Sequence, residues 1–129
     1  FADAQHKQWL NQLLHPLIRQ TLLQRCQEAS GDYVILMAPL LFENGLDQAV
    51  QRTLCIDVSE QTQIARTCQR DGNSSELVQA IMDSQLSRAE RLQRSDDRID
   101  NEGNDFDALR ERVRQLHITY LSLSAQHPQ

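Results

Sequence analysis

The chain has 129 residues, of which 13 are basic and 18 acidic, and so a formal net charge of −5. This balance is atypical of a nucleic-acid binder, which usually carries a basic excess, and no apolar run approaches the roughly 20 residues that span a bilayer. The four glycines form neither G-x-G-x-x-G nor G-x-x-x-x-G-K-[ST], so we expect any glycine-rich phosphate loop to lie outside this sequence.

Apolar residues recur at helical spacing over residues 9–23, with Pro16 in the middle. A proline disfavours the α conformation of the residue before it, which here is His15. The sequence therefore predicts one helix that ends near His15. A second helix is predicted to hold Pro16 in its first turn and to run to about Ala29.

Two apolar runs, at residues 33–38 and 53–58, have the length of strands. Continuous apolar strands are typical of a parallel sheet that is covered on both faces. The 14 residues from 39 to 52 are enough for the crossover that parallel strands require. We therefore expect residues 33–38 and 53–58 to form parallel strands.

A helix is predicted over residues 60–70, with Ser59 as its N-cap. Residues 71–74 break this helix, and another helix follows. Ile99 lies in a short strand-like segment, DDRIDN, and the last helix is predicted to begin near residue 104. That last segment has the clearest amphipathic pattern of the chain. The order of elements predicts an α/β fold.

The segment from residue 66 to residue 98 holds six arginines, six acidic residues and no lysine. Arg66 and Arg70 are spaced for one helix face, and so are Arg88 and Arg91. Arginine forks match phosphate oxygens two at a time, which suits a flap that closes over a polyphosphate. A solvated helical surface with salt bridges explains the same spacing.

Polar residues follow both predicted strands, at the edge where open α/β sheets bind ligands. Asp57 and Ser59 end the second strand, although helix capping explains them equally well. Glu43 follows the first strand, where it either orients a substrate or pairs with an arginine.

The three cysteines, Cys26, Cys55 and Cys68, are an odd number without a C-x-x-C pair. This usage is typical of a reducing compartment, so we expect a cytoplasmic protein. No H-x-x-x-H, Cys/His cluster or compact carboxylate set indicates a bound transition metal, so we predict no metal site in this sequence.

Several motifs, in this order, resemble the later part of dephospho-coenzyme A (dephospho-CoA) kinases, a family of P-loop kinases. The matching segments are LNQLLHPLI (10–18), PLLFE (39–43), IDVSEQTQIAR (56–66), QRD (69–71), residues 85–91, SDDRIDN (95–101) and LHxxYL (116–121). The resemblance covers nearly all of residues 9–121. It implies a P-loop NTPase-like parallel sheet flanked by helices, incomplete here, together with helical CoA-domain and lid segments.

The family transfers the γ-phosphoryl group of ATP to the ribose 3′-hydroxyl of dephospho-CoA, the last step of coenzyme A biosynthesis. The resemblance implies a domain plan of four segments. Residues 1–30 are helices of the substrate (CoA) domain, residues 31–66 and 96–129 are two parts of the nucleotide-binding core, and residues 67–95 are the lid.

The resemblance also implies roles for single residues. Arg66 matches the catalytic arginine that reaches the transferred phosphate, and Arg70 and Arg91 match lid positions that face ATP. Asn101 is expected on the adenine side. The residues expected to line the dephospho-CoA side are His15, Pro39, Leu40 and Glu43.

The family's P-loop, with its lysine and its Mg²⁺-binding Ser/Thr, is absent from this sequence. We therefore expect the P-loop and the ligands of Mg²⁺ with ATP to lie outside it, and the 129 residues alone to be inactive. We also expect a sheet without its first strand to self-associate. Arg98 stands where the family usually has an apolar residue. The alternative is a non-catalytic helical interaction module derived from the kinase.

Overall fold

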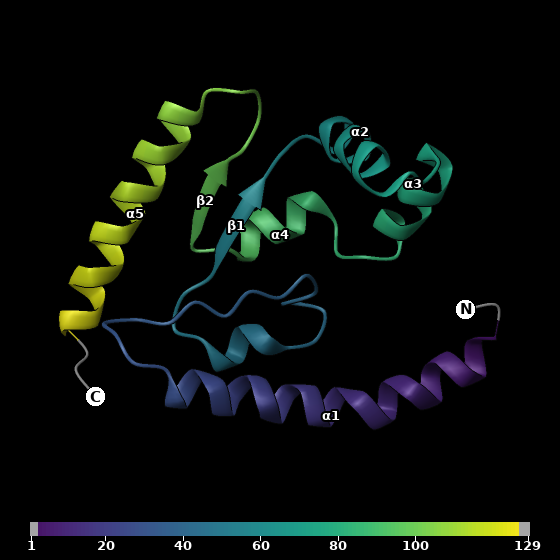
Figure 1. Cartoon of the computed structure of the whole chain (residues 1–129), viewed down its shortest axis with the longest axis horizontal. Helices are drawn as coiled ribbons and strands as arrows, with labels where there is room; N and C mark the ends of the chain where they lie inside the picture. Colours follow the sequence, from purple (N-terminus) through teal and green to yellow (C-terminus); the bar gives the residue numbers. More distant parts are fainter. Residues whose placement is uncertain (1–2, 127–129) are drawn as a thin grey trace. The chain divides into compact units, whose positions relative to one another are not determined.

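The computed structural model describes residues 3–126. The chain forms two compact units, Phe1–Ala38 and Pro39–Gln129. Figure 1 shows the first unit from purple to blue and the second from blue to yellow. The strands and most of the predicted site residues belong to the second unit.

The described part of the first unit, residues 3–38, holds one helix, α1 (Ala4–Glu28), whose N-cap Asp3 accepts hydrogen bonds from the backbone of Gln5 and His6. The prediction of two helices that meet at His15 and Pro16 is wrong, because α1 continues through Pro16. A proline removes one backbone donor from the ladder. The good helix formers on both sides, mostly leucine and glutamine, continue the helix past it.

The predicted strand over residues 33–38 is wrong, because this segment is irregular. Three of its apolar side chains are exposed: Val34, Ile35 and Met37 are 50%, 75% and 90% accessible. A strand needs a neighbour for its backbone groups, and in the described chain the two strands pair with each other. The expected crossover over residues 39–52 is therefore wrong as well. Those residues form hydrogen-bonded turns and a short 3₁₀ helix, η1 (Leu46–Ala49).

The second unit contains a parallel pair of strands, β1 (Leu54–Asp57) and β2 (Asp97–Asp100). The predictions of strands around 53–58 and Ile99 are confirmed, as is the α/β class with a parallel sheet. In this register Cys55 lies opposite Arg98, and Asp57 lies opposite Asp100. Because side chains alternate along a strand, these four residues share one face of the sheet.

Three helices lie between the strands: α2 (Glu60–Asp71), α3 (Ser75–Asp83) and α4 (Arg88–Arg94). Each begins after a serine whose hydroxyl accepts a backbone N–H from the first turn, as N-caps do. These serines are Ser59, Ser74 and Ser87. Gly72 ends α2 with φ at 70°, a conformation that suits glycine. The predicted helix over 60–70 is confirmed.

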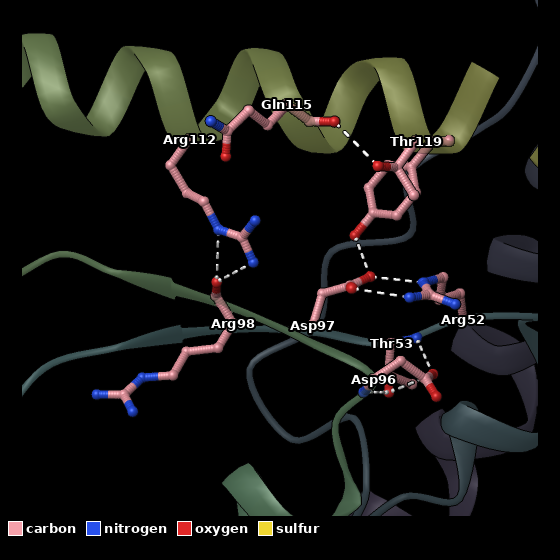
Figure 2. Close-up of polar contacts among 9 residues, drawn as sticks. Arg52, Thr53, Asp96, Asp97, Arg98, Arg112, Gln115 and Thr119 are labelled. Atoms are coloured by element: carbon pink, nitrogen blue, oxygen red, sulfur yellow. Dashed lines mark hydrogen bonds and ion pairs between the residues drawn. The ribbon is translucent and has the colours of Figure 1, made fainter. Parts of the chain in front are cut away.

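The last helix, α5 (Phe106–Gln126), packs against β2, whereas α4 packs against β1 (Figure 1). The buried apolar side chains of the described residues are Leu46, Val78, Ile99 and Leu116. Arg112 of α5 donates two hydrogen bonds to the carbonyl oxygen of Arg98, at 3.1 and 2.9 Å, and so covers the outer edge of β2 (Figure 2). Within residues 3–126, no helix is long and apolar enough to cross a membrane.

Candidate functional site

The carboxyl ends of β1 and β2 meet at one edge of the sheet, because the strands are parallel. Two loops leave this edge, one toward α2 and one toward α5. The backbone N–H of Asn101 donates to the carbonyl oxygen of Asp57 at 2.8 Å, and this bond extends the pairing by one residue. Open α/β sheets bind ligands at this edge.

Arg66 reaches from α2 to the loop that follows β2. Its guanidinium donates to the carbonyl oxygens of Asn101, at 2.9 Å, and Gly103, at 3.3 Å. A guanidinium carries five N–H donors, so these two bonds leave donors for an anionic ligand. The structure thus brings together Arg66 and Asn101, two predicted site residues that lie 35 positions apart.

Glu102 ties the same loop to the start of α2. Its carboxylate accepts the backbone N–H of Ser59 at 2.8 Å and the hydroxyl groups of Ser59 and Thr62. The Thr62 hydroxyl, followed by the Ser59 N–H, holds the pKa of Glu102 below its usual range. A negative charge is favourable at a helix N-terminus. Glu102 could not be recognised from the sequence, because no local spacing connects it with Ser59.

Asp57 is the most buried charged group at this edge, with only 3% of its side chain exposed. Arg88 of α4 donates to both carboxylate oxygens at 2.8 Å, and Arg98 approaches Oδ2 at 2.7 Å. The hydrogen bonds from Arg88, above all, hold the pKa of Asp57 below its usual range, although burial acts in the opposite direction. The three side chains together carry one net positive charge.

The two predicted lid arginines lie in different surroundings. Arg70 is exposed in the last turn of α2 and pairs with its neighbour Asp71 at 2.8 Å. Arg91 donates to the carbonyl oxygen of Leu86 and, with Arg88, lines a cavity of about 180 Å³. The cavity lies among the start of α2, the end of α3 and the start of α4, and acidic side chains also line it.

The residues predicted for the dephospho-CoA side are divided between the two units. Pro39, Leu40 and Glu43 lie in the turn that opens the second unit. The Glu43 carboxylate accepts the backbone N–H of Leu86 at 3.2 Å and so connects this turn with the α3–α4 loop. His15 lies exposed on α1, in the first unit.

A model of the family described as dephospho-CoA kinase matches residues 1–107. Proteins named dephospho-CoA kinase from Shewanella oneidensis and Aeromonas hydrophila are 53% and 50% identical to the chain, each over 98% of it. A crystal structure of a Thermus thermophilus protein is similar over 92% of the chain, with a TM-score of 0.74 and 25% identity. The chain spans 62% of the length of each of these three proteins.

Proposed function

Because the chain belongs to the dephospho-CoA kinase family, we propose that the full-length protein catalyses the reaction of that family. The protein transfers the γ-phosphoryl group of ATP to the ribose 3′-hydroxyl of dephospho-CoA. The chain spans 62% of the length of the two relatives named above, so the activity is proposed for the full-length protein.

The position of Arg66 carries this proposal. Phosphoryl transfer requires little covalent chemistry from the protein and depends on positioning and charge stabilisation. Arg66 lies at the carboxyl edge of the sheet, bonded to the loop that carries Asn101. From there its remaining donors neutralise charge on the transferred phosphoryl group, and Asn101 contributes to the adenine side.

The other site residues take the roles that the family implies. Arg70 and Arg91 bind ATP phosphates from the lid, residues 67–95. Arg70 is exposed and pairs with its neighbour Asp71, a contact that a more strongly charged phosphate can replace. Pro39, Leu40, Glu43 and His15 line the side of dephospho-CoA.

Mg²⁺ accompanies ATP in this reaction and helps to neutralise its phosphates. Within the described chain, no group of three or more His, Cys, Asp or Glu side chains is arranged to hold a metal ion. We propose that the Mg²⁺ ligands and the P-loop lie in the remainder of the full-length protein.

We also propose that the protein works in the cytoplasm. Cys26, Cys55 and Cys68 are free thiols, as is usual where the medium keeps thiols reduced. The domain plan of residues 1–30, 31–66, 67–95 and 96–129 is part of the same proposal.

The reaction is tested with the full-length protein, ATP, Mg²⁺ and dephospho-CoA. We expect coenzyme A and ADP to appear in equal amounts. Pantetheine, which lacks the ribose hydroxyl, is the matched acceptor control and should yield no phosphorylated product. ATP turnover that is independent of dephospho-CoA, or no turnover at all, would contradict the proposed function.

A further inference from the structure

The carboxylate of Asp57 is shared by two arginines that come from different elements. Arg88 occupies both oxygens from α4, and Arg98 shares Oδ2 from β2. The register of the strands places Arg98 on the same face of the sheet as Asp57. In Figure 2 the Arg98 side chain accordingly extends away from α5. One arginine is enough to neutralise Asp57, so the carboxylate would stay paired if one of the two arginines moved away.

The two arginines differ in what else they can reach. Arg88 lines the cavity of about 180 Å³ together with Arg91, which lies three residues later on α4. Its side chain is 34% exposed, so a ligand in solution has access to it. A phosphate group offers a guanidinium two oxygens, as a carboxylate does, and with more negative charge. A nucleotide phosphate is therefore a direct competitor of Asp57 for Arg88.

If Arg88 were the sole partner of the Asp57 carboxylate, its departure would require a large free energy. A buried charge that loses its partner is strongly destabilising, and Asp57 is almost fully buried. Arg98 removes this obstacle, because it keeps a 2.7 Å contact with Oδ2 that does not depend on Arg88. Asp57 thus remains paired while Arg88 changes partner.

We propose that Arg88 is a further phosphate-binding residue, held by Asp57 until an ATP phosphate replaces that carboxylate, and that Arg98 keeps Asp57 paired after the exchange. This inference rests on the proposed function, because the ligand that it names is ATP. Arg88 contacts the substrate directly, whereas Asp57 and Arg98 are positioning residues that act through it.

The test is a calorimetric titration of the full-length protein with ATP, together with thermal unfolding. Arg88→Met should raise the Kd for ATP about tenfold, as loss of one charged contact does, and Arg98 should keep the protein folded. Arg88→Lys retains the charge without the fork, so it should fold like the wild type and bind ATP more weakly. Arg110→Met, on the exposed surface of α5, is the matched control and should change nothing.

The role of Arg98 has its own readout. Arg98→Met should weaken ATP binding severalfold. In this variant the move of Arg88 to the phosphate would leave the Asp57 carboxylate without a paired arginine. Asp57→Asn removes the negative charge that needs a partner. Adding Arg98→Met to Asp57→Asn should therefore leave the Kd for ATP the same as in Asp57→Asn alone. A purely structural role for Arg98 would affect unfolding in both backgrounds and ATP binding in neither.

Two results would overturn the inference: Arg88→Lys that binds ATP as tightly as the wild type, or an Arg98→Met effect that persists in Asp57→Asn. Failure of the proposed function has a different signature. A wild-type protein that binds ATP but forms no coenzyme A contradicts that function and leaves the exchange standing. A wild-type protein that binds no ATP contradicts both.

Discussion

The hydroxyl of Tyr120 donates a 2.8 Å hydrogen bond to Oδ2 of Asp97 and thereby joins α5 to the first residue of β2. Arg52 donates to the same carboxylate through Nε, at 2.6 Å, and Nη2, at 2.9 Å (Figure 2). The Asp96 carboxylate accepts the backbone N–H of Thr53 at 2.8 Å. These contacts fasten the amino ends of the strands, whereas the candidate site occupies their carboxyl ends.

Removal of the Tyr120 hydroxyl should destabilise the protein. Burial, followed by the hydrogen bond to Asp97, raises the pKa of Tyr120, so the group is a neutral donor at pH 7. Tyr120→Phe should lower the free energy of unfolding by about 1 kcal/mol, measured by urea denaturation of the full-length protein. Thr119→Ala removes a hydroxyl that bonds within α5 and is the control. Equal stabilities of Tyr120→Phe and the wild type would contradict this role.

The ion pair of Arg52 and Asp97 should make the free energy of unfolding depend on pH in the acidic range. The pKa of Asp97 is lowered, mainly by the hydrogen bond from Arg52. A carboxyl group with a lowered folded pKa stabilises the fold fully above its unfolded pKa, near 4, and this stabilisation is lost as the pH falls through the folded pKa. We expect the free energy of unfolding of Arg52→Met to be lower at pH 7 and to fall less steeply below about pH 5. If the free energies of unfolding of Arg52→Met and the wild type fall in parallel as the pH is lowered, the ion pair does not have this role.

Arg66 should matter for the rate of the reaction. Arg66→Met in the full-length protein should lower kcat by about 10²–10³-fold, the effect of removing a charged donor from a transition state. Arg66→Lys should recover part of the rate, because the charge is kept. Arg110→Met, with an exposed ion pair on α5, serves as the control in a steady-state assay of coenzyme A formation. A normal kcat for Arg66→Met would remove Arg66 from the catalytic role.

Glu102 should hold the loop after β2 in place. Glu102→Gln loses the charge that attracts the Ser59 N–H and the Thr62 hydroxyl. We expect faster amide hydrogen exchange over residues 101–105 and a KM for ATP raised about threefold to tenfold. Glu111→Gln, in the exposed pair with Arg114, is the matched control. Unchanged exchange in the loop would show that the Glu102 contacts are not needed there.

The 129 residues by themselves should be inactive and should self-associate. Ile56, in the middle of β1, is 56% exposed, and Phe106, at the start of α5, is 67% exposed. Exposed apolar surface of this kind favours association. Light scattering of the purified 129-residue chain should therefore give a mass above 14.9 kDa, and an ATP-dependent assay should detect no coenzyme A. A stable monomer, or coenzyme A formation by this chain, would contradict the respective expectation.

Local signals were sufficient for much of the second unit. Ser59 and Gly72 cap α2 through hydrogen bonds that span at most four residues, so their effect can be recognised in the sequence. The strand-like segment DDRIDN around Ile99 was also predicted and is confirmed as β2. Residues 33–38 are a continuous apolar run and yet form no strand. A strand exists only where a neighbour supplies hydrogen bonds, and that depends on the path of the whole chain.

The sequence by itself determined the α/β class, the capped helices of the second unit and the family, because each follows from short-range patterns or from the order of motifs. Only the tertiary structure decided which charges meet. Asp57 and Arg88 are 31 residues apart, and Thr62 and Glu102 are 40 apart. No local rule connects such pairs. The Thr62–Glu102 contact forms because parallel pairing brings two distant strand ends to one edge. The Asp57–Arg88 pair forms because α4 packs against β1, where a buried carboxylate must find a cation.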